Sequence, residues 1–396
     1  MRKTNYKEGY RGAIIQTIRE NGFLPLDSLR LYEKPVAIQY QRCVRRLKEE
    51  GLIEELRTIN KARYVRFTEE GENLIKEELG GGKYAPYLTE KTKYVLRYLK
   101  LESTDKEKRI AYKLQQNKFV NDVSSKLYAE LCGIYSEDVP DLNDGLVEDG
   151  LKAFYDSAKV KSMGSYRAAR INDRYSNKIN NSRINGLSIS PGGIYSVYNI
   201  GKVLPEWRRN GEDKMAACIR MLASRSMRDF SAPSYEKEAV IISANDKNFV
   251  RIVTEKEEED SHRRKLMTID QAYDHMYALP YTCEGVKMYK IMQLPNWQAK
   301  LREQFLTHDE IQESKFAQVS CDGYDMRDRV YKLVFCIPDM TKLKSFIKRA
   351  EMQGTKDKFF LYCYDHQLPV VTEIVKEHAK VFSVDIDDMC LELDVE

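Results

Sequence analysis

The chain has 396 residues and a net charge of only +4, from 65 basic and 61 acidic residues, so any polyanion site must come from local clustering. A chain of this length is longer than a domain with a single hydrophobic core usually is, and a 42% hydrophobic content excludes global disorder. We therefore expect two or three packed domains. No segment approaches the roughly 20 apolar residues that cross a bilayer, and the first residues lack a signal-peptide core, which predicts a cytoplasmic protein without membrane contact.

The first 79 residues predict three helices followed by a hairpin. The expected elements are, in chain order, a helix that ends at Asn21 and Gly22, a short helix capped by Asp27 or Ser28, a helix from Pro35 to Gly51, a hairpin over 52–68 and a helix over 68–79. The third helix carries one apolar stripe, which begins at Val36 and faces inward. Its opposite side therefore faces solvent or a partner.

Basic side chains gather on the third helix and on the hairpin. On the helix, the candidate contacts on or beside the outward face are Gln39, Arg42, Arg45 and Arg46. On the hairpin they are Arg57, Lys61, Arg63 and Arg66. Because both elements would meet one phosphate track, we interpret them as a DNA-binding surface. In the alternative interpretations, the helix arginines pair with Glu49 and Glu50, or the domain contacts only proteins.

This order of elements resembles a winged helix-turn-helix. The residues that carry the resemblance are Gly51-Leu52-Ile53 before the hairpin and Thr68-Glu69-Glu70-Gly71 after it. The resemblance implies that the third helix is a recognition helix in the major groove of double-stranded DNA. It also implies that the hairpin is a wing whose bases contact phosphates.

The middle of the chain predicts a linker and a strongly basic segment. Gly80 to Gly82 indicate a hinge, and 80–140 reads as a hinge with a helical connector that could join the protomers of a homo-oligomer or buttress the next domain. Segment 159–183 holds seven basic residues against the single acid Asp173. Its candidate contacts to single-stranded or distorted DNA are Arg167, Arg170, Arg174, Lys178 and Arg183. A solvated loop is an equally open interpretation.

The stretch "RINGLSISPGGIYSVYNIG" predicts a second hairpin, and "EDKMAACIRMLASRS" predicts an amphipathic helix after it. A winged helix followed by these elements resembles the replication-relaxation family of plasmid and conjugative elements, in which the second domain looks like a restriction-endonuclease-type fold. Such a nuclease needs acids on the hairpin to hold a metal. This hairpin has none, and the nearest acids are Glu206, Glu212 and Asp213. We therefore expect no catalytic residue, metal or cofactor here.

The remainder, within a domain spanning 141–396, predicts mixed α/β structure, which gives an α+β to α/β multidomain fold class. "EAVIISAND" and "KNFVRIVTE" read as two strands. After residue 329 the chain alternates continuous apolar strands with helices, a pattern typical of a parallel sheet buried on both faces. The carboxyl ends of such strands would place Pro338-Asp339, Tyr364 to His366 and Asp385 to Asp388 near one edge. A metal there is the less favoured alternative to helix capping.

Three functions remain open from these observations. The first is a sequence-specific DNA-binding protein of a plasmid, conjugative element or phage, acting in replication, transfer or its regulation. The second is a metal-dependent enzyme that nicks or cleaves DNA, although the five histidines never form the His-x-His pair of common relaxases. The third is an adaptor that binds DNA through the winged helix and another protein through its C-terminal domain.

Overall fold

The structure is a computed structural model with two compact units, residues 1–128 and 129–396. It describes residues 9–78, 90–134, 139–142, 144, 147–148, 150–170, 182–202, 209–226, 236–245, 247–254, 272–317, 319–353 and 356–395. Within these ranges it leaves aside the side chains of 78, 90, 164–170, 209–210, 222–226 and 251–254. The hinge predicted at Gly80 to Gly82 lies outside the described residues, and each unit is considered by itself.

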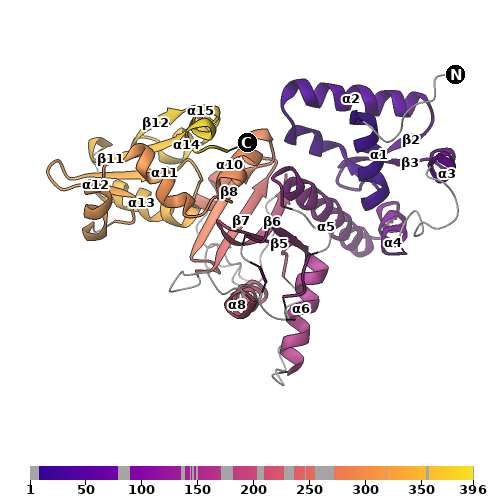
Figure 1. Cartoon of the computed structure of the whole chain (residues 1–396), viewed down its shortest axis with the longest axis horizontal. Helices are drawn as coiled ribbons and strands as arrows, with labels where there is room; N and C mark the ends of the chain where they lie inside the picture. Colours follow the sequence, from indigo (N-terminus) through magenta and orange to yellow (C-terminus); the bar gives the residue numbers. More distant parts are fainter. Residues whose placement is uncertain are drawn as a thin grey trace. The chain divides into compact units, whose positions relative to one another are not determined.

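Unit 1 begins with the predicted helices and hairpin (Figure 1). Its elements are α1 (Gly9–Asn21), β1 (Leu24–Pro25), the 3-10 helix η1 (Leu26–Leu31), α2 (Lys34–Glu49), β2 (Ile53–Arg57), β3 (Arg63–Phe67) and α3 (Glu69–Glu78). The strands form an antiparallel sheet in the order β1-β3-β2. The expectation that Asp27 or Ser28 caps the second helix is wrong, because η1 starts directly after Pro25 and no side chain caps it.

Both faces of this small sheet are covered within unit 1. On one face, Val65 packs into a core with Ile18 of α1 and Leu47 of α2. On the other face, Tyr64 packs against Leu99, because successive strand residues point to opposite sides. Leu99 ends α4 (Glu90–Leu99), and residues of α5 (Lys106–Leu131) join the same cluster, so the connector packs against the wing.

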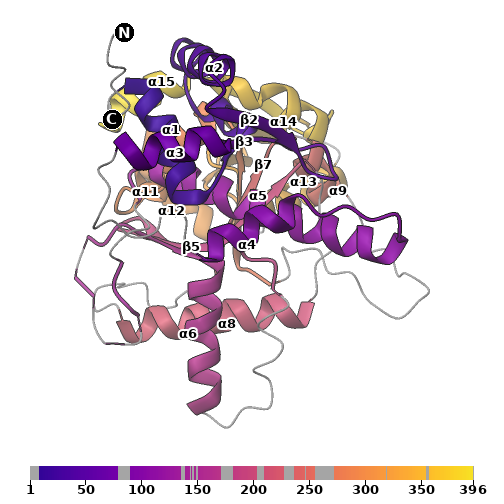
Figure 2. The same ribbon diagram turned by 90° about the vertical axis from the view of Figure 1, so that its right-hand side faces the viewer.

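Unit 2 contains a five-stranded sheet in the order β4-β5-β6-β7-β8. Its elements are β4 (Ala153–Asp156), α6 (Ser157–Arg170), β5 (Gly186–Ser190), β6 (Gly193–Gly201), α8 (Arg209–Ser226), β7 (Glu238–Ser243), α9 (Lys247–Thr254) and β8 (His275–Pro280). The first three strands are antiparallel neighbours, and β6, β7 and β8 are parallel. Figure 2 shows α6 and α8 crossing each other beside this sheet. The predicted hairpin and amphipathic helix are therefore present as β5, β6 and α8.

The strand predicted over "KNFVRIVTE" is wrong, because this stretch forms helix α9. Valine and isoleucine favour strands, but the apolar residues at 249, 250, 252 and 253 have the spacing of one helical face. Asn245 also accepts a hydrogen bond from the backbone N–H of Lys247 at 3.2 Å, which helps to start the helix. The spacing outweighs the strand propensity of the individual residues.

The rest of unit 2 forms a four-stranded sheet in the order β12-β11-β10-β9. Its elements are α10 (Cys283–Ile291), α11 (Trp297–Phe305), α12 (His308–Glu313), η3 (Ser314–Phe316), β9 (Gly323–Asp325), β10 (Val330–Val334), α13 (Met340–Gln353), η4 (Lys356–Lys358), β11 (Phe359–Tyr364), η5 (Asp365–Gln367), α14 (Leu368–Val375), β12 (Lys380–Val384) and α15 (Ile386–Glu392). The predicted parallel sheet is confirmed in β10, β11 and β12, and β9 adds an antiparallel edge. The mixed α/β fold class is thus confirmed.

No disulfide forms in the described part of the chain, which includes all eight cysteines. Among the helices described, none combines the length and the hydrophobicity that crossing a membrane requires.

Candidate nucleic-acid interface

The outward face of α2 carries the basic residues that the sequence places there. Val44 and Leu47 are buried and fix the rotation of the helix. Four polar side chains of its other side are exposed, namely Gln39, Arg42, Arg45 and Arg46. The inward stripe and the outward bases therefore occupy separate faces of α2, as its periodicity predicts.

The arginines of α2 are only weakly neutralised by nearby acids. Arg45 approaches Glu49 at 3.6 Å, but both side chains are largely exposed, and such pairs contribute little. Glu50 instead accepts a hydrogen bond from Arg11 at 2.8 Å. Within the described residues, Arg42 forms no ion pair, and the same is true of Arg46. The pairing expected in the alternative interpretation is thus limited to Arg45.

The wing places two exposed arginines opposite each other. Arg57 of β2 and Arg63 of β3 are directly paired in the antiparallel register, so they lie on the same face of the sheet. Like charges at such a position are unfavourable by roughly 0.2–1 kcal/mol. Glu55 on this face relieves part of the repulsion, since it binds Lys48 at 2.7 Å and Arg63 at 3.8 Å. The Lys48 hydrogen bond is the largest cause that lowers the pKa of Glu55.

The other two basic residues of the wing have different surroundings. Lys61 is exposed in the turn, where its φ of 66° lies in the left-handed region. Arg66 is half-buried and its Nε donates to Glu54 at 2.7 Å across the sheet. Arg66 is therefore held within the hairpin, while the other three bases of the wing are exposed.

These residues form one local excess of positive charge, which we call the basic surface: Arg42, Arg45, Arg46, Arg57, Lys61 and Arg63. From Lys34 to Phe67 the chain has nine basic and four acidic residues. This excess of five charges exceeds the net +4 of the whole chain, so the remaining residues are together close to neutral.

A buried glutamine of α5 holds the tip of the wing. Gln116 is 1% exposed, and its side-chain oxygen accepts a hydrogen bond from the backbone N–H of Ile59 at 2.9 Å. Its amide nitrogen donates toward the carbonyl oxygens of Tyr98, Leu99 and Leu101 at 3.2, 3.2 and 3.0 Å. The connector thus fixes the turn between β2 and β3. Sequence reasoning missed Gln116, because a single glutamine in a helix has no distinctive pattern.

The structure describes only part of the basic segment 159–183. Lys159 and Lys161 use their ammonium groups inside the fold, since they donate to the carbonyl oxygens of Val139 and Ser182, both at 2.9 Å. Arg183 has an exposed side chain. Arg167 and Arg170 lie on α6 but their side chains are outside the described residues, as are Arg174 and Lys178 entirely.

Glu212, one of the acids that follow the β5–β6 hairpin in the sequence, is a buried hydrogen-bond acceptor in unit 2. Glu212 of α8 is fully buried and accepts hydrogen bonds from the Ser182 hydroxyl at 2.7 Å, the Arg183 backbone N–H at 2.8 Å and the Tyr198 hydroxyl at 2.6 Å. The Tyr273 hydroxyl lies 2.6 Å from that of Tyr198 and extends the network. Burial raises the pKa of Glu212, against the opposing effect of these hydrogen bonds. The carboxylate of Glu212 is therefore already engaged in hydrogen bonds within unit 2.

A second polar cluster surrounds His275 at the start of β8. Its Nδ1 lies 2.6 Å from Asp339, and its Nε2 lies 3.0 Å from Glu236. The hydrogen bond to Asp339 is the largest cause that raises the pKa of His275 to about 9. Nearby, burial raises the pKa of Glu238 to about 7. Since the two bound acids occupy opposite nitrogens of the ring, they do not converge on one point.

Neither protein-family models, nor curated proteins, nor solved structures give a match. Over the residues described, no group of three or more histidine, cysteine, aspartate or glutamate side chains is arranged to hold a metal ion. Functional inference therefore depends on the geometry of the chain itself.

Proposed function

We propose that unit 1 binds double-stranded DNA sequence-specifically through α2 and the wing. The observation that carries this proposal is the directly opposed, exposed pair Arg57 and Arg63, together with the weakly neutralised arginines of α2. A cross-strand pair of like charges disfavours the isolated fold, and a phosphate between the two guanidinium groups would reverse that effect. The basic surface is thus complementary to a polyanion.

The two elements would contribute differently to recognition. An exposed helix face with Gln39, Arg42 and Arg46 offers side chains that hydrogen-bond to base edges in a major groove. The wing offers Arg57, Lys61 and Arg63, whose role would be to bind phosphates irrespective of sequence. Arg66, which is bound to Glu54, would keep the hairpin in register instead of contacting DNA.

At a finer level, we propose a protein of a mobile genetic element, of the replication-relaxation type. The order of elements supports this, because a unit with α2 and a wing precedes the hairpin β5–β6 and helix α8. In this proposal the second unit is a binding module without nuclease activity. The engagement of Glu212 by Ser182, Arg183 and Tyr198 supports that part.

The test begins with the purified full chain and a random pool of duplex DNA, from which bound sequences are selected. Affinity for a selected site should fall steeply as salt increases, because bound phosphates release counterions. Arg42→Ala and Arg46→Ala should each weaken the selected site by about 1–3 kcal/mol and reduce its preference over random DNA. Lys61→Ala should weaken both DNAs alike and reduce the salt slope by about 1.

Arg97→Ala is the matched control, since Arg97 is exposed and belongs to α4, outside α2 and the wing. Equal binding by the control and by the variants of the basic surface would contradict the proposal. Incubation of the bound site with magnesium or manganese distinguishes the enzymatic alternative, because a nick that is lost in a Glu212→Gln variant whose thermal unfolding is unchanged would show that unit 2 is catalytic.

A further inference from the structure

Unit 2 contains a cavity where three strands of two different sheets end. β8 ends in Pro280, β10 leads into Phe335 and Pro338, and β11 leads into His366, and all four residues line it. The cavity volume is about 200 Å³. The sequence expectation that Pro338, His366 and Asp385 follow strands at one edge of a sheet is met, because β10, β11 and β12 are parallel. Asp385 caps α15 there, as the favoured interpretation expected. The carboxyl ends of strands are where α/β proteins bind ligands.

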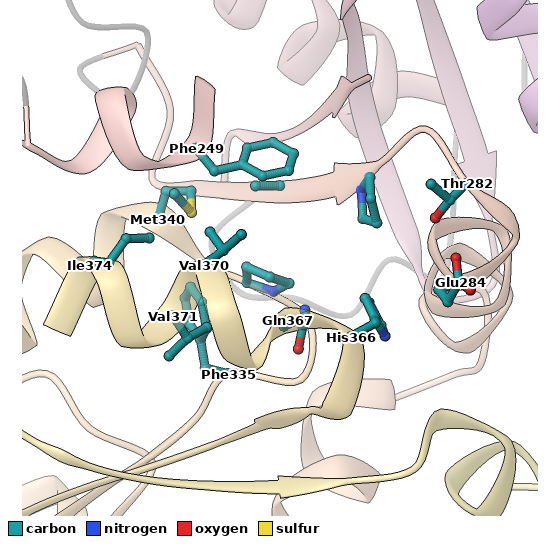
Figure 3. Close-up of a pocket in the computed structure, with 13 residues that line it drawn as sticks. Phe249, Thr282, Glu284, Phe335, Met340, His366, Gln367, Val370, Val371 and Ile374 are labelled. Carbon is teal, nitrogen blue, oxygen red and sulfur yellow. The ribbon is translucent and has the colours of Figure 1, made fainter. Parts of the chain in front are cut away.

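The two ends of the cavity differ in chemistry. Figure 3 shows Phe249, Met340 and Ile374 at one end, and Thr282 and Glu284 at the other. The first three side chains are buried and apolar, and they come from α9, α13 and α14. A ligand here would bury an apolar body at one end and place a polar group at the other.

The polar residues of the lining are Thr282, Glu284, His366 and Gln367, and among them only Glu284 carries a carboxylate that can pair with a cation. The amide of Gln367 is already used, since its oxygen accepts from the Tyr364 N–H at 2.8 Å and its nitrogen donates to the Cys336 carbonyl at 3.1 Å. Burial tends to raise the pKa of Glu284, but hydrogen bonds, above all from Thr282, outweigh it and the pKa is lowered. Glu284 is thus an ionised carboxylate, half-buried at the polar end.

The cavity volume limits the size of the ligand. An engineered apolar cavity of about 150 Å³ binds benzene, so about 200 Å³ accommodates a ring with a short substituent. The hydrogen bond from Thr282 leaves the negative charge of Glu284 in place, and a cation that donates hydrogen bonds neutralises such a charge in partly apolar surroundings. Both requirements are met by a compact arylalkyl or alkyl amine.

We infer that this cavity is a binding site for a small primary amine, whose ammonium group pairs with Glu284 and whose apolar body lies against Phe249, Met340 and Ile374. The site lies entirely within unit 2 and does not depend on DNA binding by unit 1. It gives the second unit a ligand of its own.

The test uses isothermal titration of the full chain with three probes of similar size: 2-phenylethylamine, 2-phenylethanol and 3-phenylpropanoate. The amine should bind at least about tenfold more tightly than either the alcohol or the anion. Glu284→Gln keeps the shape of the side chain but removes its charge, so it should weaken the amine about tenfold and change the alcohol less than about twofold. Glu373→Gln, an exposed carboxylate on α14, is the control and should change neither.

A second variant tests the location. Val370→Phe adds a ring to a half-buried side chain of the lining and should abolish binding of both the amine and the alcohol. Thermal unfolding confirms that each variant is folded. The inference is overturned if no probe binds to the wild type, if the amine loses nothing on Glu284→Gln, or if a folded Val370→Phe binds as well as the wild type.

Discussion

The basic surface of unit 1 and the Glu212 network of unit 2 use polar side chains in opposite ways. Arg57 and Arg63 are exposed, carry like charges at directly opposed positions, and share Glu55 as a nearby acid. Glu212 is fully buried and accepts three hydrogen bonds from its own unit. The difference teaches that a polar cluster indicates a binding surface only when its groups remain exposed and weakly paired. A cluster that is completed internally indicates structure.

The largest effect is expected where the network is broken. Glu212→Ala leaves the hydroxyls of Ser182 and Tyr198 without their acceptor in a buried site. We expect the free energy of unfolding to fall by about 2–4 kcal/mol in urea titrations, while binding of a short duplex at 25 °C is retained. Glu303→Ala removes an exposed carboxylate from α11 and should change stability by less than about 0.5 kcal/mol. Equal stability of the two variants would show that Glu212 is not structural.

The second largest effect on stability is expected at Gln116, the buried residue that holds the turn of the wing. Gln116→Ala removes the acceptor of the Ile59 N–H and should lower the stability of unit 1 by about 1–3 kcal/mol. Amide exchange at Ile59 should accelerate relative to the rest of β2 and β3. Gln115→Ala, at the adjacent half-buried position, is the control and should leave exchange at Ile59 unchanged. If Ile59 exchanges at the same rate in both variants, the wing is not held by α5.

His275 lies between the two extremes, since a third of its side chain is exposed. Its pKa is raised from 6.5 to about 9, so its protonated form stabilises the fold, fully below pH 6.5 and progressively less as pH rises through 9. Allowing for solvent screening, we expect stability to fall by about 1–2 kcal/mol over this window.

Chemical denaturation between pH 7.5 and about 9.5 measures this change in stability. The window starts above the pKa of Glu238, which is about 7, so that the titration of Glu238 contributes less. His275→Gln should flatten the profile, because Asp339 and Glu236 then face a neutral amide. His308→Gln, an exposed position on α12, should keep the slope. A slope that persists in His275→Gln would assign the titration to another group.

The smallest effect tests the exposed side of the comparison. Arg57→Thr removes one of two opposed like charges and should stabilise unit 1 by about 0.2–1 kcal/mol, while weakening DNA binding. Arg66→Thr is the contrasting variant, since it breaks the pair with Glu54 and should destabilise the hairpin. A loss of stability in Arg57→Thr would mean that this arginine serves the fold.

The sequence predicts local elements well where periodicity and turn residues agree. Pro35 and Gly51 bracket α2 closely, and the Pro-Gly-Gly turn separates β5 from β6. The prediction fails at α9, where the β-branched residues of the stretch conflict with its helical spacing. Local pattern is therefore a sufficient guide only when composition and spacing point the same way.

The partners of individual side chains could not be predicted from local pattern. Lys159 and Lys161 belong to the most one-sided charge run in the chain, yet both bind backbone carbonyls of distant residues. Gln116 is an isolated polar residue whose partner Ile59 is far away in the chain, and the cavity beside Glu284 is likewise lined by distant segments. Such roles arise from tertiary packing, which fixed spacing does not encode.

The support of the wing by α5 also affects the expected rates of association with DNA and dissociation from it. A wing whose turn is already fixed by Gln116 has little to order when its partner arrives, so encounter would be governed by electrostatic steering. Discrimination between cognate and random DNA would then appear in the lifetime of the complex, with similar association rates for both. Proteins that order a flexible wing on binding would instead show slower association that varies with sequence.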